Sequence, residues 1–415
     1  MLESLFPIAS KKCLALPLFG PIMEEFTNWL VQQGYVRLYI RAVLNAVRKM
    51  DQYLRRKGVH RIDEISSAAL SSYWQSRRRR APWQSGPVHI MERFLRMRGL
   101  CTANQPTTPT RLQLAEYSDY LRDVRGLASG TIYDQLWLAE QLLVHLGFDK
   151  DQKRLAGIDA KDIEGFVQKI AKTISRATLQ HRISQLRNFL RFLATTDKIA
   201  TGLADQIDGP RLYRFEKLPR TLSWQTVQGL LRSIPKTTAN GRRDFTMLFL
   251  IATYGLRSSE VAALTLDDVD WRAGQIRIRQ TKTDNTLVLP LTDATAKVLI
   301  AYLRQVPRPS GARHLFFQVR APINPLKRGA LRYVFDKWSK RSGLGIAFHG
   351  PHCLRNSFAV HLLSQGTSLK TIGDLLGHHH PETTAGYLRL ASDELRQVGL
   401  SVPRTGRRKE AEHEQ

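Results

Sequence analysis

Cysteine is scarce in this sequence, and long apolar segments are absent from it. Only Cys13, Cys101 and Cys353 occur among 415 residues, and an odd number without paired spacing argues against a disulfide framework. We therefore expect a reducing compartment, the cytoplasm. No segment approaches the ~20 consecutive apolar residues that a membrane-spanning helix requires. The longest apolar run, residues 245–254, instead predicts a buried helix.

Acidic residues are also few. The chain has 36 Asp and Glu against 63 Lys and Arg, which gives a formal net charge of +27. A charge of this size predicts a polyanionic partner, with nucleic acid as the first expectation and a membrane surface as the second. Because the basic residues are spread along the chain, the sequence favours a large binding surface over a single basic arm.

Several kinds of phosphate and metal site lack their usual residues in this sequence. There is no GxxxxGK[ST] phosphate-binding loop and no spaced acidic set that would hold magnesium. His378, His379 and His380 are consecutive, so their side chains point in different directions, and no Cys, Asp or Glu cluster lies at zinc-ligand spacing. We therefore expect no metal and no cofactor.

The pattern of apolar residues divides the chain into helical blocks joined by linkers. Residues from about 22 to 100 and from about 112 to 200 show helical spacing, and polar segments that contain proline separate the blocks. After residue 223 the pattern is mixed, because helices flank a β-hairpin over residues 275–291, where apolar residues alternate with polar ones. From residue 290 to about 400 the chain is again expected to be helical.

The predicted fold is therefore mainly α-helical with a small β-hairpin or sheet. Helical domains, joined by linkers, would precede an α+β domain. The predicted domains are an additional N-terminal helical domain as a candidate DNA-binding module, a second helical domain as a candidate DNA-binding domain, the α+β domain as the candidate catalytic domain, and a polar tail: residues 1–102, 111–203, 215–402 and 403–415.

The second helical block carries candidate DNA-contacting residues. The segment 176–193 predicts a helix with one apolar face. Arg182, Arg187 and Arg191 fall on other faces of that helix, where we expect them to meet DNA phosphates.

Two candidate catalytic residues near the start of the catalytic domain are ordinary when each is considered alone. Arg257 precedes Glu260 by three positions, so the glutamate could fix the arginine's rotamer, but a pair of this kind is usually a surface ion pair. Lys282 lies near the tip of the predicted hairpin, where a lysine is ordinarily solvated. A mobile lysine that reaches a scissile phosphate could instead protonate the leaving oxygen.

A second group of candidates lies in the last part of the catalytic domain. His352 and Arg355 are three positions apart early in a predicted helix, where both could hold a phosphate. His378 follows a helix end that Gly377 is expected to cap. Tyr387 comes nine residues after His378. Alone it would be read as a half-buried packing residue, but among cationic donors its phenolate could attack a phosphodiester.

Taken together, these residues resemble the catalytic set of the tyrosine recombinase, or phage integrase, family. The resemblance covers roughly residues 220–395, and the block 112–200 is similar in type to the family's core-binding domain. Asn356 and His379 stand where many relatives have histidine and serine. The residues that follow the family's order and come close to its spacings are Arg257, Lys282, His352-x-x-Arg355, Leu376-Gly377-His378 and Tyr387.

The resemblance implies a site-specific DNA recombinase that serves the integration or transposition of a mobile element. Tyr387 would attack a DNA phosphodiester, form a 3′-phosphotyrosyl link and release a 5′-hydroxyl. The bond energy would stay in the phosphotyrosine, so neither ATP nor a metal would be needed. A 5′-hydroxyl from a partner duplex would then reverse the step.

The resemblance also implies a role for each surrounding side chain. Arg257 and Arg355 would hold the non-bridging phosphate oxygens, and His378 would add a hydrogen bond there. His352 would assist proton transfer at the tyrosine. Lys282 would protonate the 5′-oxygen as it leaves.

The partners implied are double-stranded DNA with specific recombination sites and further copies of the chain. A monomer or dimer in free form would become a homotetramer on DNA, and two rounds of exchange would pass through a Holliday junction. Accessory or sister recombinases are further candidate partners, and no membrane partner is expected. The expected location is the bacterial cytoplasm, at the nucleoid.

Two other functions compete with this interpretation. A type IB topoisomerase uses the same phosphotyrosine chemistry as a monomer, without strand exchange between sites, but it typically has lysine or arginine where His352 stands. A non-catalytic DNA-binding accessory protein is the other alternative, and the presence of every catalytic member argues against it.

Overall fold

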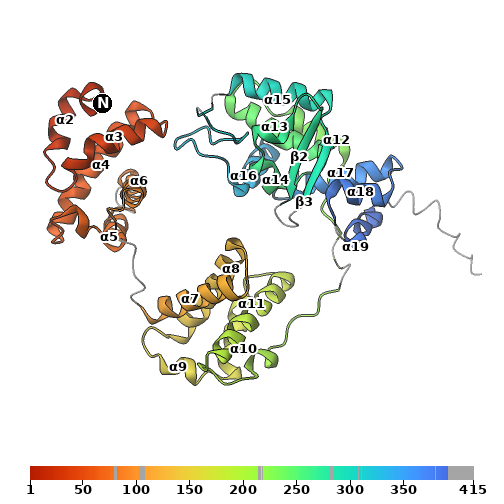
Figure 1. The fold of residues 1–415 in the computed structure, drawn as a ribbon. Helices are drawn as coiled ribbons and strands as arrows, with labels where there is room; N and C mark the ends of the chain where they lie inside the picture. Colours follow the sequence, from red (N-terminus) through yellow and green to blue (C-terminus); the bar gives the residue numbers. More distant parts are fainter. Residues whose placement is uncertain are drawn as a thin grey trace, which may run out of the picture. The chain divides into compact units, whose positions relative to one another are not determined.

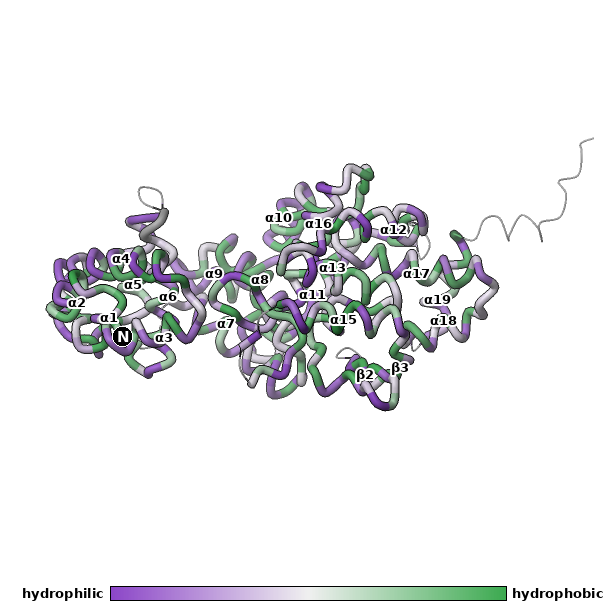
Figure 2. The backbone as a smooth tube through the Cα atoms, turned by 90° about the horizontal axis from the view of Figure 1, so that it is seen from above, coloured by the Kyte–Doolittle hydropathy of each residue, from purple (hydrophilic) through white to green (hydrophobic). Residues whose placement is uncertain are grey.

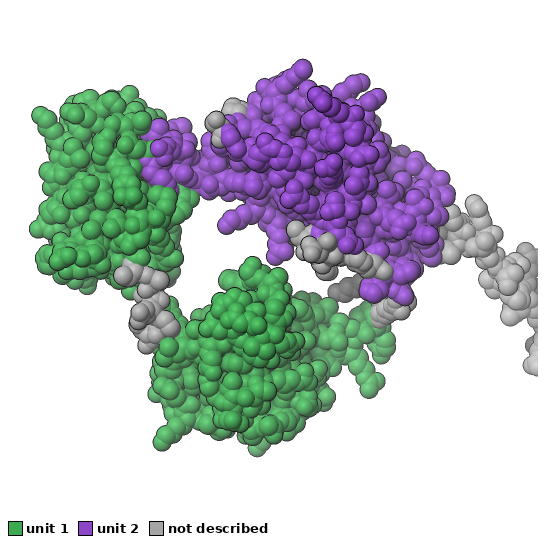
Figure 3. Space-filling view, in the orientation of Figure 1, with its two compact units in different colours: residues 1–28, 37–216 green, residues 29–36, 217–415 purple. Residues whose placement is uncertain are grey.

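The structure is a computed structural model that describes most of the chain. It divides into two compact units, residues 1–28 with 37–216 and residues 29–36 with 217–415 (Figure 3). Helices and one small antiparallel sheet make up the elements (Figure 1). The described residues are 1–78, 82–101, 108–213, 216, 218–280, 285–306, 308–309, 311–378 and 380–390.

The N-terminal part of the chain is helical, as its sequence pattern predicts. Helix α4 shows the reason, because Ile40, Val43, Leu44 and Val47 are buried and follow the spacing of one helix face. Ser66 caps helix α5 by accepting a hydrogen bond from the amide of Ala69. The elements are α1 (Leu2–Leu5), α2 (Pro7–Leu14), η1 (Gly20–Ile22), α3 (Met23–Gln32), α4 (Arg37–Arg56), η2 (Ile62–Glu64), α5 (Ser67–Arg77) and α6 (Pro82–Met97).

A second helical block has its own apolar core. The helix predicted over residues 176–193 is confirmed as α11, which buries Ile183, Leu186, Leu190 and Leu193 on one face. This core includes buried side chains from Tyr117 to Ile207. The elements are α7 (Pro109–Asp119), η3 (Tyr120–Val124), α8 (Ser129–Leu146), α9 (Lys153–Ala156), α10 (Ala160–Ala171), α11 (Arg176–Thr195) and η4 (Leu203–Gln206).

The third block combines helices with a three-stranded antiparallel sheet of order β1-β2-β3. In the hairpin Ile276 pairs with Leu289 and Ile278 with Leu287, so its apolar side chains share one face. The predicted hairpin is therefore confirmed over its described strands. The elements before the last helices are α12 (Trp224–Arg232), α13 (Ala239–Tyr254), α14 (Ser258–Ala263), η5 (Leu266–Asp268), β1 (Val269–Asp270), β2 (Gln275–Gln280), β3 (Asn285–Pro290) and α15 (Asp293–Gln305).

Helix α13 lies at the centre of this block. The apolar run predicted to form a buried helix lies within it, and α13 packs against α15 and α17. The colouring of the backbone by hydropathy shows apolar and polar residues interspersed along the helices of the chain (Figure 2). The remaining elements are α16 (Arg328–Arg341), α17 (His352–Ser364), α18 (Leu369–Leu376), α19 (Pro381–Ala385) and η6 (Gly386–Leu390).

The prediction of continuous helix after residue 290 is wrong between α15 and α16. Described residues there form loops with two isolated bridges, Thr265 to His314 and Phe317 to Pro325. Pro309, Pro322 and Pro325 account for the break, since proline lacks an amide donor and restricts the residue before it. Among the described helices, none has the length and apolar character that crossing a bilayer demands.

Candidate active site

Arg257 is positioned by the start of helix α14. It is the N-cap residue, and Glu260 closes a capping box by accepting from the Arg257 amide at 2.7 Å. The other oxygen of Glu260 accepts from the Arg257 guanidinium, also at 2.7 Å. Glu260 is buried, so this pair differs from the solvated surface pair that the spacing alone suggested. The carboxylate thus holds the arginine in one orientation.

Arg355 lies deeper, in the first turn of α17. It is 2% exposed and donates one hydrogen bond to the carbonyl of Gly255 and another to the carbonyl of Leu376, each at 2.6 Å. Burial, followed by the charge of Arg257, lowers the pKa of Arg355 to about 10. The guanidinium is therefore still charged at neutral pH, and both carbonyls come from helix ends that meet at the site.

Two histidines lie in the field of these arginines. Packing around the ring of His352, followed by the charges of Arg355 and Arg257, lowers its pKa, although one side of the residue is exposed. Burial and then the same two arginines lower the pKa of His378 to about 4. Both imidazoles are thus neutral at pH 7 without DNA. The Nδ1 atom of His378 lies 2.9 Å from the hydroxyl of Thr384, which fixes the ring.

Tyr387 lies in a small apolar core formed by α17, α18 and η6. The tyrosine is 5% exposed, and its ring stacks against that of His378 with a centroid distance of 6.3 Å. Burial raises its pKa, while Arg355 and Arg257 oppose the shift. Helix α19 begins at Pro381 and ends at Ala385, so Tyr387 lies on the 3-10 turn η6 that follows it.

Asn356 contacts Tyr387 and was not recognised as a site residue from the sequence. Its Oδ1 accepts a hydrogen bond from the Tyr387 hydroxyl at 3.1 Å, and its Nδ2 donates to the carbonyl of Arg220 at 3.0 Å. The available signal was its departure from the histidine of many relatives, directly after Arg355. This difference did not predict the contact with Tyr387, because residues 356 and 387 approach each other only through the tertiary fold.

Gly377 caps helix α18 as predicted, and because it has no side chain, Gln280 of strand β2 can lie against the end of this helix. Its φ is +61°, and a Cβ atom there would lie 2.0 Å from the side-chain amide of Gln280 on strand β2. A cleft of about 240 Å³ opens beside it and is lined by hairpin residues together with Asp374 and His378. The hairpin and the histidine therefore share one recess.

The structure brings five of the six predicted catalytic residues together. The charges of Arg257 and Arg355 reach all three of the others, which are His352, His378 and Tyr387. Lys282 lies outside the described residues. Of the residues that the structure describes, no three His, Cys, Asp or Glu side chains form a group that could hold a metal ion.

The arginines of α11 are engaged within their own block. Arg182 lies over the ring of Trp137, with 4.6 Å from its guanidinium carbon to the ring centroid. Arg187 donates to the carbonyl of Ile207, and Arg191 pairs with Asp205 at 2.9 Å. Their role in DNA binding stays a prediction. To bind DNA phosphates, these arginines would have to give up their present contacts or share them with the phosphates.

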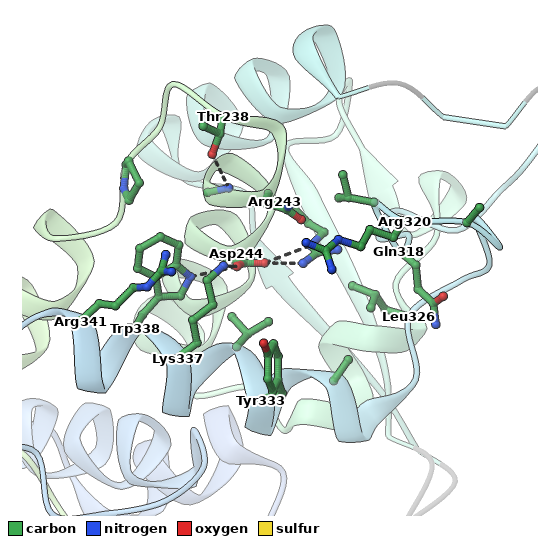
Figure 4. A pocket seen from close by; sticks show the side chains of 17 residues that line it. Thr238, Arg243, Asp244, Gln318, Arg320, Leu326, Tyr333, Lys337, Trp338 and Arg341 are labelled. Atoms are coloured by element: carbon green, nitrogen blue, oxygen red, sulfur yellow. Dashed lines mark hydrogen bonds and ion pairs between the residues drawn. The ribbon is translucent and has the colours of Figure 1, made fainter. Parts of the chain in front are cut away.

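A separate cavity of about 710 Å³ lies between α13, α16 and the loop around residue 320 (Figure 4). The buried carboxylate of Asp244 is at its centre and accepts hydrogen bonds from Arg243, Lys337 and Trp338 at 2.7–3.0 Å. None of the catalytic candidates lines this cavity. We interpret the network as the connection between α13 and α16, since each of its members belongs to one of these helices.

Comparison with known proteins identifies the family. The sequence model described as "Phage integrase family" matches residues 220–394, and "Phage integrase, N-terminal SAM-like domain" matches residues 114–196. The integrase/recombinase-type protein y4gC of Sinorhizobium fredii is 37% identical over 192 residues, which cover 45% of this chain and 98% of that protein. The chain belongs to the phage integrase family.

Two further proteins are similar to this integrase over more of its chain. The integrase/recombinase-type protein y4rA, also from Sinorhizobium fredii, is 29% identical over 400 residues, 94% of this chain and 97% of that protein. The crystal structure of XerH site-specific recombinase bound to a palindromic difH substrate matches with a TM-score of 0.54 and 19% identity, over 74% of this chain and 93% of that one.

These findings confirm the predicted fold class and the predicted enzyme class. The protein is a tyrosine recombinase, an enzyme that breaks and rejoins strands of DNA, its partner. Membership of this family decides against a type IB topoisomerase and against a non-catalytic accessory protein.

Proposed function

We propose that Tyr387 is the nucleophile with which this recombinase attacks DNA. The observation that carries the proposal is that Tyr387 and two histidines all lie within range of the charges of the same two arginines. The phenolic oxygen would bond to the scissile phosphorus while the bond from phosphorus to the 5′-oxygen breaks. The product is a 3′-phosphotyrosyl link and a free 5′-hydroxyl, and the same chemistry in reverse joins a new strand.

Arg257 and Arg355 would bind the two non-bridging oxygens of that phosphate. A guanidinium offers five N–H donors in a planar fork, and the carbonyl and carboxylate partners of these two arginines use only part of that set. Because both side chains are already held in place, little reorganisation is needed as negative charge develops in the transition state. His378, fixed by Thr384, would donate a further hydrogen bond to the phosphate.

His352 and Lys282, the remaining two candidates, would transfer the protons of the reaction. Without DNA, Tyr387 is protonated at neutral pH, and its hydroxyl donates a hydrogen bond to the Oδ1 atom of Asn356. An incoming phosphate would partly neutralise the arginines and raise the basicity of His352, which would then accept the tyrosine's proton. Lys282 would give a proton to the departing 5′-oxygen, so that proton gain and loss balance.

We further propose the biological setting. The relatives are named as integrases or recombinases, which supports integration or transposition of a mobile element. Strand exchange between two sites would take place in a homotetramer on DNA, formed from free monomers or dimers with accessory or sister recombinases as candidate partners. It would act at the nucleoid of the bacterial cytoplasm, where its DNA lies. We also propose the domain bounds that the sequence predicts, which are residues 1–102, 111–203 and 215–402.

The substitution Tyr387→Phe tests the assignment. We expect the variant to bind duplex DNA with the affinity of the unchanged protein and to form no covalent adduct with a nicked suicide substrate. Tyr333→Phe, at an exposed tyrosine of the same domain, is the matched control and should form the adduct normally. An adduct recovered from Tyr387→Phe would show that another residue is the nucleophile.

A further inference from the structure

The N-terminal helices, which the two matched family models leave out, repeat the order of the SAM-like domain. In each block a first helix is followed by a long second helix, a short helical turn, a capped third helix and a fourth helix (Figure 1). The order α3, α4, η2, α5, α6 thus corresponds to α7, α8, α9, α10, α11, with α1, α2 and η1 preceding the first set and η3 continuing α7 in the second.

The third helices correspond residue by residue. Ser66 and Asp159 are their N-caps, and each accepts a hydrogen bond from the amide three residues later. The buried residues before and after each cap then follow at identical spacing: Ile65, Leu70 and Tyr73 in the first block, and Ile158, Ile163 and Phe166 in the second.

The second and fourth helices correspond in the same way. On the fourth helices, identical spacing relates buried Val88, Met91, Phe94 and Leu95 to buried Ile183, Leu186, Phe189 and Leu190. On the second helices, it relates buried Ile40, Val43, Leu44 and Val47 to buried Gln135, Leu138, Ala139 and Leu142. Spacing of this kind within one helix is common to amphipathic helices, but corresponding buried positions on three helices that follow in the same order are what a shared helical fold produces.

One aromatic contact joins the first helix to the fourth in both blocks. The rings of Phe26 and Phe94 lie 5.1 Å apart at an interplanar angle of 57°. At the corresponding positions the rings of Tyr117 and Phe189 lie 4.8 Å apart at 53°. The packing of the two blocks is therefore alike as well as their helix order.

The two blocks differ in charge. Residues 1–101 contain seventeen Lys and Arg against seven Asp and Glu, whereas residues 108–213 contain fifteen against thirteen. In the second block, Arg122 and Arg191 pair with aspartates. The first block therefore has the larger share of positive charge that no acidic residue balances.

Part of that charge forms a stripe on α4, which we define as Arg41, Arg48 and Arg55. Residues seven apart lie on nearly the same side of a helix, and this side flanks the buried face that contains Ile40 and Leu44. The stripe spans roughly 21 Å along the helix axis, at 1.5 Å per residue. Within the described residues no hydrogen bond or ion pair joins any of the three to an acidic side chain. Arg41 and Arg55 are exposed and Arg48 is half-buried.

We propose that residues 1–101 are a second, more basic copy of the SAM-like fold, and that the arginine stripe of α4 binds the sugar-phosphate backbone of duplex DNA. A row of unpaired guanidiniums matches a row of phosphates, because each can bind phosphate oxygens bidentately. The stripe thereby strengthens binding without reading bases. The inference requires only that the substrate is DNA and does not depend on the roles assigned to the catalytic residues.

The test compares two triple variants of the full chain on a random-sequence duplex of about sixty base pairs, long enough for several phosphate-binding surfaces at once. In R41Q/R48Q/R55Q the stripe loses its charge. In the matched control R61Q/R96Q/R98Q, three arginines that already pair with Asp63, Glu92 and Glu25 lose theirs, so the net charge of the block falls equally. Thermal unfolding establishes that both variants are folded.

We expect the stripe variant to reduce the slope of log affinity against log salt by about 0.9 for each phosphate that is no longer bound, or roughly 2.7 for three. Its affinity near physiological salt should fall at least tenfold, and R41K/R48K/R55K should recover most of it. The control should stay within twofold of the unchanged protein. At saturating protein the stripe variant should still form the Tyr387 adduct, which separates failure of this inference from failure of the nucleophile assignment.

Two results would overturn the inference. Equal loss of affinity in both triple variants would mean that only net charge matters. An unchanged slope in the stripe variant, with altered self-association in sedimentation, would assign the stripe to a protein partner instead of DNA.

Discussion

At the scale of single residues, Asn356 connects the proposed nucleophile to the start of the catalytic domain. Its side chain accepts from Tyr387 and donates to the carbonyl of Arg220, and both hydrogen bonds are largely buried. We predict that Asn356→Leu, which keeps the size and removes both hydrogen bonds, slows single-turnover cleavage about tenfold, as expected for ~1.4 kcal/mol of weaker positioning. DNA affinity should not change, because Asn356 is not placed among the phosphate ligands. Cleavage at the normal rate would assign Asn356 to packing alone.

His378 provides a prediction about acid sensitivity. Burial and the neighbouring arginines lower its pKa in the folded protein to about 4, whereas an unfolded chain has the ordinary value of about 6.5. As the pH falls from 6.5 to 4 the unfolded state takes up the proton first, so the stability that His378 contributes as a neutral ring is lost in that window.

We therefore predict that His378→Asn loses less stability than the unchanged protein between pH 6.5 and pH 4, with an upper limit of ~3 kcal/mol for the difference. Urea unfolding at several pH values measures it. His60→Asn, at an exposed position in the N-terminal block, is the control and should leave the pH dependence unchanged. Parallel acid losses in the unchanged protein and in His378→Asn would contradict the assignment.

At the scale of elements, the end of α18 carries much of the site. Gly377 has a φ of +61°, its own carbonyl accepts from Arg257 at 3.4 Å, and the carbonyl of Leu376 accepts from Arg355. We predict that Gly377→Ala lowers both stability and cleavage, because an added Cβ would collide with Gln280 and shift both carbonyls. The left-handed backbone alone costs about 1–2 kcal/mol for a residue with a side chain.

Gly366→Ala is the matched control for that prediction. Gly366 follows the end of α17 with a φ of +81°, and a Cβ there would meet nothing within 4 Å. The two variants should share the backbone cost, measured by urea unfolding, while only Gly377→Ala should lose cleavage by tenfold or more. Equal cleavage in both would mean that the α18 end does not position the arginines.

The elements also show which parts of the structure the sequence was sufficient to predict and which it was not. Local patterns predicted α11, the β2–β3 hairpin and the glycine cap of α18, because apolar period and turn residues are read within one segment. They missed the break between α15 and α16, where several prolines outweigh the apolar spacing. The turn η6 under Tyr387 and the contact of Asn356 depend on packing between segments far apart in the chain, which no local pattern contains.

At the scale of the whole molecule, the chain contains apolar cores that share no residue. One core includes buried side chains from Tyr117 to Ile207, and another includes side chains from Val227 to Leu354. A buried charge network lies beside the second core, where Asp244 joins α13 to α16 through Arg243, Lys337 and Trp338 (Figure 4). Such a protein is expected to unfold in more than one step, because each core can unfold separately.

Asp244→Ala tests this expectation. The substitution leaves the buried Arg243 and the half-buried Lys337 without their carboxylate, and removing one partner of a buried pair costs about 3–5 kcal/mol. We predict that only the transition of the catalytic domain shifts in calorimetry and that the other transitions keep their midpoints. Asp205→Ala is the control, because its exposed pair with Arg191 contributes about 0–1 kcal/mol to the other block. If Asp244→Ala lowered every transition together, the blocks would unfold as one cooperative unit, and the proposed domain bounds would have to be redrawn.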